Sequence, residues 1–187
     1  MRRTLILAAA FAGLFATPAL AHPGHTMAGD LVTGLLHPFM GLDHILAMVA
    51  VGLLAVQSGG KSKIALPALF VGVMIVGGYV GLSAIGAPFI EQGIIASVIL
   101  LGAIVAFGKQ MPLTFSAPFI AVFALFHGAA HGMEMPVDTS AAAYGMGMIA
   151  ATGALHFLGM AAGRFAPQLV RYAGAAVTVA GVSLAIV

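Results

Sequence analysis

The sequence predicts an all-α fold, a polytopic membrane bundle of about six transmembrane helices that follows a cleaved signal peptide. Of the 187 residues, 61% are hydrophobic and only 6% are charged, and the mean hydropathy is +1.13. In a typical soluble domain about 25% of the residues are charged. The remaining observation is a series of apolar stretches close to the roughly 20 residues that cross a bilayer as a helix. Lipid, and not water, is therefore the expected solvent for most of the surface.

The N-terminus is typical of an export signal. Two arginines precede an apolar run, and small residues then lead to a predicted cleavage site after Ala21. This predicts a signal peptide over residues 1–21 and a single transmembrane domain over residues 22–187, with His22 as the first mature residue. The alternative is that the segment stays attached as a first helix. In both cases the chain after it is delivered outside the cytoplasm.

Glycine, proline and the scarce charged residues divide the rest into six apolar stretches. They cover residues 31–56, 64–85, 90–107, 113–131, 141–162 and 169–187. The loops after the first, third and fifth stretches hold every Lys and Arg beyond the signal: Lys61, Lys63, Lys109, Arg164 and Arg171. Because basic loops stay on the cytoplasmic side, the mature N- and C-termini are expected to be periplasmic. The predicted location is the bacterial inner (cytoplasmic) membrane.

Composition also limits the chemistry. The formal net charge is +2, but the basic residues are scattered and form no patch, so nucleic acid is not an expected partner. The chain has no cysteine, which leaves His, carboxylate, Met sulfur and backbone oxygen as metal ligands. No phosphate-binding glycine pattern is followed by Lys and Ser or Thr, which argues against an ATP-driven pump.

The first apolar stretch carries the run HPFMGLDH over residues 37–44. The stretch is expected to be a helix, in which a rotation of 100° per residue places His37, Gly41, His44 and Met48 on one face. Pro38 lies in the first turn of this helix, where its missing N–H costs little. Asp43 then lies on a neighbouring face. It either binds a metal itself or accepts the proton of a histidine ring nitrogen, as carboxylates behind metal-binding histidines commonly do.

The fourth stretch ends in FHGAAHGME over residues 126–134. His127, His131 and Glu134 are spaced i, i+4 and i+7 along one helical face, a pattern that can present two imidazoles and a carboxylate to one ion. No Glu follows the first His as in HExxH, so the general base of a zinc protease is missing. We therefore do not expect an enzyme.

Topology brings the two runs to the same depth. The first stretch runs inward from outside and the fourth runs outward, so both runs are expected near the outer face. The predicted metal-binding residues are His37, Asp43, His44, His127, His131 and Glu134. The alternative is that these polar groups only cap and pack helices.

Further candidates for metal binding or for a path through the protein are His22, His25, Met48 and His156. Each has a simpler alternative. The two N-terminal histidines could belong to a mobile tail, Met48 could fill a gap in the core, and His156 could form a hydrogen bond between helices.

Two motifs, HPxxGxDHxxxM from His37 to Met48 and FHGxAHGxE from Phe126 to Glu134, resemble the signatures of the HupE/UreJ family. This is a family of membrane proteins associated with nickel supply to hydrogenase and urease. The resemblance carries the six predicted metal-binding residues over as residues that recognise the metal. It implies no permanent cofactor, and Ni²⁺ or Co²⁺ as a transported substrate.

The leading hypothesis is a secondary permease or facilitator for uptake of a divalent transition metal, with Ni²⁺ first. The alternative is a membrane-bound accessory protein that binds metal and hands it to a partner without moving it across the bilayer. Nickel-enzyme maturation proteins, a second copy of the chain and membrane lipid are the expected macromolecular and lipid partners. A metalloenzyme is disfavoured because no nucleophile or general base stands beside the ligands.

Overall fold

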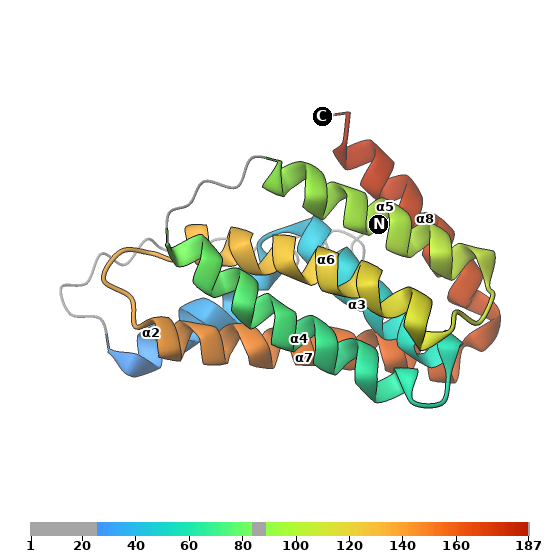
Figure 1. The fold of residues 1–187 in the computed structure, drawn as a ribbon, viewed down its shortest axis with the longest axis horizontal. Coiled ribbons are helices and arrows are strands. Elements are labelled where there is room, and N and C mark those ends of the chain that lie inside the picture. Colours follow the sequence, from blue (N-terminus) through green and yellow to red (C-terminus); the bar gives the residue numbers. More distant parts are fainter. Residues whose placement is uncertain (1–25, 84–88, 187) are drawn as a thin grey trace, which may run out of the picture.

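The computed structural model describes residues 26–83 and 89–186, and within them every regular element is a helix (Figure 1). The elements are α2 (Met27–Leu36), η1 (His37–Phe39), α3 (Leu42–Ser58), α4 (Ser62–Leu82), α5 (Ile90–Phe107), α6 (Leu113–Met133), α7 (Ala141–Phe165), η2 (Pro167–Leu169) and α8 (Val170–Leu184). The all-α prediction is confirmed for these residues. The predicted signal peptide over residues 1–21, together with His22 and His25, lies outside them.

Four of the helices, α4 to α7, are long and apolar enough to cross a membrane. The bent pair of α2 and α3 gives a fifth crossing if it is one span. Helix α8 has 15 residues, which is about 22 Å of helix against roughly 30 Å of hydrocarbon. Among the described residues, the structure therefore gives four or five candidate spans, and the predicted count of six stays a prediction.

The first predicted stretch is not one continuous helix, which corrects the sequence interpretation. The axes of α2 with η1 and of α3 differ by 81°. Pro38 lies at the start of η1, where its missing N–H favours a new helical start over a continued helix. Gly41 then takes an extended conformation, with φ −109° and ψ 121°, as the N-cap of α3. The prediction of one shared helical face is wrong for His37 and Gly41, which lie before α3, and holds for His44 and Met48, which are one turn apart on α3.

The break needs glycine at position 41 for a steric reason. A Cβ atom at this position would lie 2.6 Å from Oδ1 of Asp43 and 2.8 Å from Nδ1 of His44. Both distances are shorter than real Cβ contacts, so a larger residue would displace the two side chains. The glycine of the first motif therefore makes room for its Asp-His pair.

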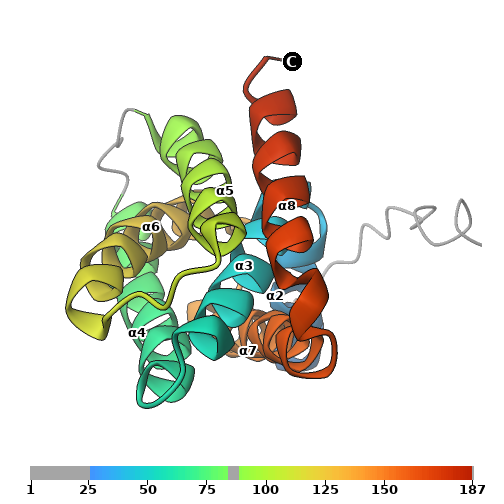
Figure 2. The ribbon, with the colours of Figure 1, turned by 90° about the vertical axis from the view of Figure 1, so that its right-hand side faces the viewer.

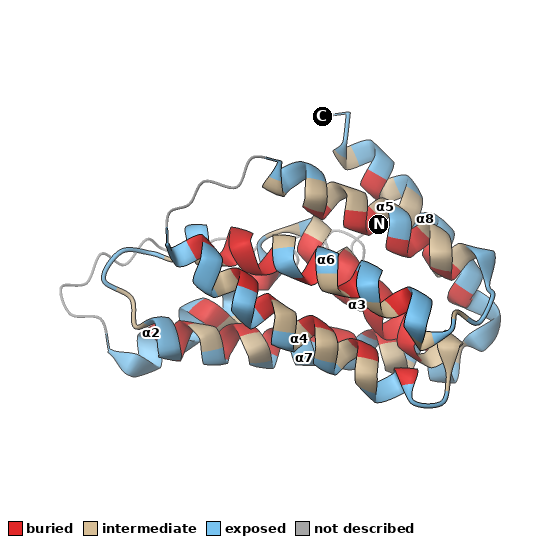
Figure 3. Ribbon diagram, viewed as in Figure 1, coloured by how far each residue is buried: buried red, intermediate tan, exposed pale blue. Residues whose placement is uncertain are grey.

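Helix α3 is the centre of the bundle. Viewed along the bundle in Figure 2, it is surrounded by α4, α5 and α7, all of which contact it. Ala47, Val51 and Ala55 on α3 are fully buried, and Figure 3 shows the buried residues gathered on the inner faces. The outer faces still carry large apolar side chains such as Phe119 and Phe157. An apolar outer surface over an apolar core is typical of a membrane protein.

Glycines set the distance between α4 and α6. A Cβ added at Gly128 would overlap the backbone oxygen of Met74, and one at Gly132 would overlap that of Gly78. On the facing helix α4, a Cβ at Gly81 would overlap the backbone oxygen of Ala129 on α6. The two backbones are therefore in direct contact, which only small residues allow.

Replacing Gly128 with alanine is expected to destabilise the bundle by about 1–3 kcal/mol, because an added methyl group must push α4 and α6 apart. The measurement is the apparent melting temperature of the detergent-solubilised protein, followed by circular dichroism. Gly72→Ala in α4 is the matched control, since a Cβ at Gly72 has no neighbour within 4 Å among the described residues. Equal melting temperatures for the two variants would contradict the expectation.

The two ends of the bundle differ in chemistry. The α3–α4, α5–α6 and α7–α8 connections lie together at one end in Figure 1. Two hydrogen bonds join them there, from Gln57 Nε2 to the backbone oxygen of Lys109 and from Arg171 Nε to that of Ala106, both at 3.1 Å. These connections and the adjoining helix turns hold every Lys and Arg of the described residues. The N-terminal end of α3 and the C-terminal end of α6 lie at the opposite end.

Candidate metal site

Helix α6 presents two histidines to the inside of the bundle. His127 is fully buried and His131 is 3% exposed. Each is followed by one of the glycines that pack on α4. Since consecutive residues are about 100° apart around a helix, packing the glycine face on α4 turns the histidine face toward α3. The repeated His-Gly pairs of the second motif thus combine a packing surface with a ligand surface.

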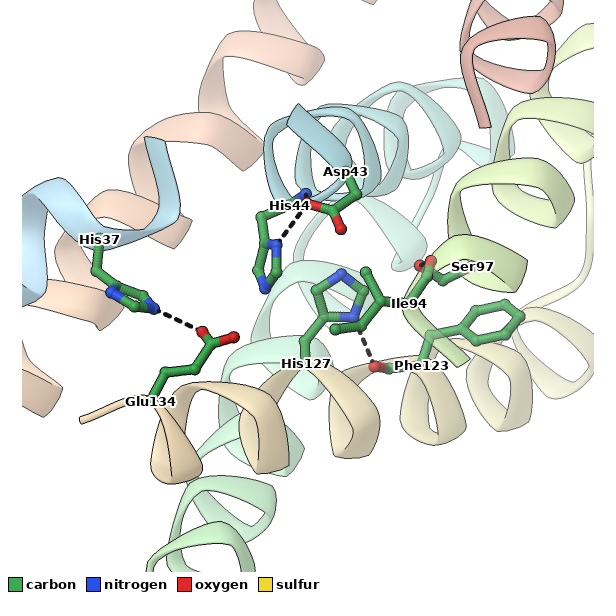
Figure 4. Close-up of polar contacts among 8 residues, drawn as sticks. All are labelled: His37, Asp43, His44, Ile94, Ser97, Phe123, His127 and Glu134. Atoms are coloured by element: carbon green, nitrogen blue, oxygen red, sulfur yellow. Dashed lines mark hydrogen bonds and ion pairs between the residues drawn. The ribbon is translucent and has the colours of Figure 1, made fainter. Parts of the chain in front are cut away.

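Helix α3 supplies the facing imidazole. The ring of His44 lies with its centroid 5.2 Å from that of His127 and 4.6 Å from that of His131. Nδ1 of His44 donates to Oδ1 of Asp43 at 2.7 Å, and the same oxygen accepts the backbone N–H of His44 at 2.8 Å. Figure 4 shows Asp43 behind His44, with the imidazole turned toward His127. Asp43 was predicted either to bind a metal or to accept the proton of a histidine ring, and in this structure it accepts the proton of His44.

Hydrogen bonds at Nδ1 fix the tautomers of two of these rings. His127 donates from Nδ1 to the backbone oxygen of Phe123 at 2.8 Å, as His44 does to Asp43. A neutral imidazole with its proton on Nδ1 carries a lone pair on Nε2. The Nε2 atoms of His44 and His127 therefore both carry the lone pair that a metal ion requires.

The third part of the site joins η1 to the end of α6. Nε2 of His37 donates to Oε2 of Glu134 at 2.9 Å, and the His37 ring lies 5.1 Å from that of His131. One ligand atom from each of His37, His131 and Glu134 lies within 4.8 Å of the others. The hydrogen bond from His37 keeps the pKa of Glu134 below its ordinary value, against the opposing effect of partial burial. This carboxylate is therefore available as an anion.

Several nitrogen atoms in this cluster have no hydrogen-bond partner among the residues that the structure describes. They are Nε2 of His44, Nε2 of His127, and both ring nitrogens of His131. A buried polar atom without a partner costs about 1–3 kcal/mol. These nitrogen atoms lie close together, and a cation bound among them would give them a partner and remove this cost.

Of the predicted site residues, His37, His44, His127, His131 and Glu134 converge, and Asp43 supports one of them. This convergence of the two motifs confirms the predicted juxtaposition. Met48 is fully buried within the apolar core. His156 on α7 is also buried, but it lies against Phe70 and not within the cluster.

Sequence reasoning missed two aromatic neighbours. The Tyr144 ring on α7 lies 5.6 Å from that of His37, and its buried hydroxyl has no partner among the described residues. A tyrosine inside an apolar span could have been noticed, since polar groups there need partners. The Phe70 ring lies 5.5 Å from that of His127 and 5.1 Å from that of His156. A phenylalanine in an apolar helix gives no signal in the sequence.

Comparison with known proteins shows the family of the chain. The family model described as HupE / UreJ protein matches residues 9–184. The chain belongs to the HupE/UreJ family. A curated relative, Protein HupE from Rhizobium leguminosarum bv. viciae, is 45% identical over 175 residues, which cover 90% of this chain and 92% of the relative. No solved structure matches.

Membership of the HupE/UreJ family confirms the resemblance that the two motifs predicted. The matched region contains all six predicted metal-binding residues. The family match and the geometry are separate observations, because the match rests on sequence and the convergence rests on how α3 and α6 pack. The match covers nearly the whole chain, and the meeting of the two motifs at one end of the bundle comes from the structure.

Proposed function

We propose that this HupE/UreJ chain is a secondary permease or facilitator that takes up a divalent transition metal, Ni²⁺ first, across the bacterial inner membrane. The observation that carries the proposal is the convergence of four imidazoles and one carboxylate in the cluster of His37, His44, His127, His131 and Glu134. The cluster lies at the end of the bundle opposite the basic loops. With those loops in the cytoplasm, an ion reaches the cluster from the periplasm.

The ligand set supports the choice of metal. Neutral imidazole nitrogen and carboxylate oxygen suit Ni²⁺, Co²⁺, Cu²⁺ and Zn²⁺. With no cysteine in the chain, thiolate cannot bias the site toward softer ions. The family resemblance favours Ni²⁺, with Co²⁺ next. The ion is the substrate of this site and not a resident cofactor, and no reaction is proposed.

A hollow beside the cluster supports the direction of entry. It lies between the start of α5 and the end of α6, has a volume of about 360 Å³, and is lined by Glu91 and Glu134 among others. Two carboxylates at its wall favour a cation over an anion. Glu134 also belongs to the cluster, so the hollow and the ligands share a residue.

The second candidate is a membrane-bound accessory protein that holds the metal and hands it to a nickel-enzyme maturation protein. The same cluster favours it, because five ligand groups at one end of the bundle are sufficient for stoichiometric binding. What separates the candidates is whether the ion reaches the other side of the bilayer.

The test uses purified protein in liposomes that enclose a Ni²⁺-sensitive dye. A permease is expected to raise internal Ni²⁺ over many turnovers, whereas an accessory protein retains only a stoichiometric amount. Protein-free liposomes provide the background rate. Internal Ni²⁺ that never exceeds the amount of protein would overturn the permease proposal in favour of the accessory one.

Uptake is expected to fall when the external solution is changed from neutral to mildly acidic pH. Imidazole must be neutral to bind a metal, so protons compete with the ion. Glu134 does not cause this loss, because its pKa is lowered and the carboxylate stays ionised there. The measurement is the initial uptake rate in liposomes at constant internal pH. A rate that rises on acidification would instead indicate proton-driven transport that outweighs ligand protonation.

A further inference from the structure

His156 is the one histidine of the described residues that the cluster does not use. Its side chain on α7 is 2% exposed, and neither ring nitrogen has a hydrogen-bond partner among those residues. A histidine kept only to join helices would donate or accept a hydrogen bond. Its two ring nitrogens therefore lack the partner that such a role would give them, and a ligand bound at His156 would supply one.

The backbone around His156 is held rigidly against the central helix. A Cβ at Gly52 of α3 would overlap the backbone oxygen of His156, and one at Gly159 of α7 would overlap that of Val49. Two glycines thus allow α3 and α7 to touch at this residue and in the next turn of α7. The imidazole is held at a defined depth and cannot easily shift to find a partner.

The ring of Phe70 lies between this imidazole and His127 of the cluster. Its ring centroid lies 5.5 Å from that of His127 and 5.1 Å from that of His156, with the second pair at an interplanar angle of 89°. His127 is in turn 5.2 Å from His44. The rings of His44, His127, Phe70 and His156 therefore form a continuous series from the cluster into the bundle.

Besides the contact of Phe70 with His156, a second side-chain contact joins α4 to α7. One helical turn from Phe70 and His156, Thr152 Oγ1 donates to Sδ of Met74 at 3.6 Å, and both residues are buried. Since α4 and α7 run in opposite directions, this pair lies on the cluster side of His156. A hydroxyl and a thioether are weak ligands in their own right. The side chains between the cluster and His156 thus include two weak metal ligands.

His156 lies deeper in the bundle than the cluster does. It stands 15 residues after Ala141, the first residue of α7, which corresponds to about 22 Å along the helix. The cluster lies near the start of α7, where Tyr144 contacts His37. His156 is therefore displaced from the cluster toward the end that carries the basic loops.

We propose that His156 is an inner metal-binding station that receives the ion from His44 and His127 past the ring of Phe70. The proposal rests on the permease function. The face of an aromatic ring attracts a cation. The metal ion can therefore pass Phe70 after it has lost part of its hydration shell. His156 then supplies a neutral nitrogen before the ion leaves toward the cytoplasm.

The test compares His156→Ala and His156→Gln in liposomes, with Ni²⁺ uptake and equilibrium Ni²⁺ binding measured on the same preparations. Glutamine keeps a hydrogen-bonding amide of similar size but is a poor ligand for Ni²⁺. Both variants are expected to bind Ni²⁺ at the cluster with unchanged affinity and to lose about tenfold or more of the uptake rate. Ser97→Ala is the matched control, since it removes another fully buried polar group on α5, and it should transport at the wild-type rate.

Uptake by His156→Gln at the wild-type rate would overturn the proposal, because it would show that a hydrogen-bonding group is sufficient. If neither variant keeps the cluster intact, the wild-type protein with ¹⁵N-labelled histidine decides. Ni²⁺ added after the cluster is saturated must then broaden the His156 imidazole signals further, and no additional broadening would reject the inner station. Failure of the permease function itself is separate, because it removes uptake from the wild type while this signal can still respond.

Discussion

Ni²⁺ uptake is expected to fall to the background rate of protein-free liposomes when His131 is replaced by alanine. This residue lies between the two halves of the cluster, with ring centroids 5.1 Å from His37 and 4.6 Å from His44. Both of its nitrogens lack partners among the described residues, so its removal deletes a ligand without breaking any hydrogen bond of the fold. Equilibrium Ni²⁺ affinity should fall by more than about a hundredfold, beyond the usual loss from a supporting residue.

Met133→Leu is the matched control for this variant. Met133 is half a turn further along α6 and is exposed, and leucine preserves its size. Wild-type uptake by Met133→Leu would also argue against thioether ligation at this end of the helix. The outcome that contradicts the first expectation is a His131→Ala protein that binds and transports Ni²⁺ like the wild type, since the cluster would then not be the site.

The sequence alone was sufficient for the class of fold and for the meeting of the two motifs. Both follow from strong signals: long apolar stretches imply helices in lipid, and a biased distribution of Lys and Arg fixes which helix ends are neighbours. Once the first and fourth stretches run in opposite directions, their histidines must share one end. The structure places the rings of His44 and His127 5.2 Å apart.

The shape of the first stretch could not be predicted in the same way. A hydropathy pattern does not distinguish one straight helix from two joined at an angle, because both halves are apolar. The local signals, Pro38 and Gly41, were interpreted as compatible with a helix, whereas their combination turns the chain by 81°. His37 reaches His131 because of this turn and not because it shares a helical face with His44.

The details that set the chemistry depend on packing. Which ring nitrogen of His127 carries the proton depends on the backbone oxygen of Phe123, which is one helical turn away and has no distinctive side chain. The approach of Phe70 to His127 and His156 depends on the glycine contacts between α4 and α6. Contacts of this kind arise from three-dimensional fit, and a single sequence does not encode them in any one residue.

Asp43→Asn is expected to lower the Ni²⁺ affinity of the protein by about 10–100-fold while leaving its melting temperature nearly unchanged. The carboxylate accepts the Nδ1 proton of His44 at 2.7 Å and thereby keeps the lone pair on Nε2. An amide is neutral and can also present its NH₂ group, so it holds this tautomer less firmly. It also removes the negative charge that makes the His44 nitrogen a stronger donor to the metal.

Two readouts separate this positioning role from a general loss of charge. Asp138→Asn is the control, because Asp138 is an exposed residue of the α6–α7 loop with φ 66°, a conformation that asparagine tolerates, and its affinity should match the wild type. The ¹⁵N shifts of the His44 imidazole should move toward a mixture of tautomers in Asp43→Asn only. Weaker Ni²⁺ binding with an unchanged His44 tautomer would show that Asp43 binds the ion directly. Unchanged binding would show that the tautomer is fixed by the α3 backbone alone.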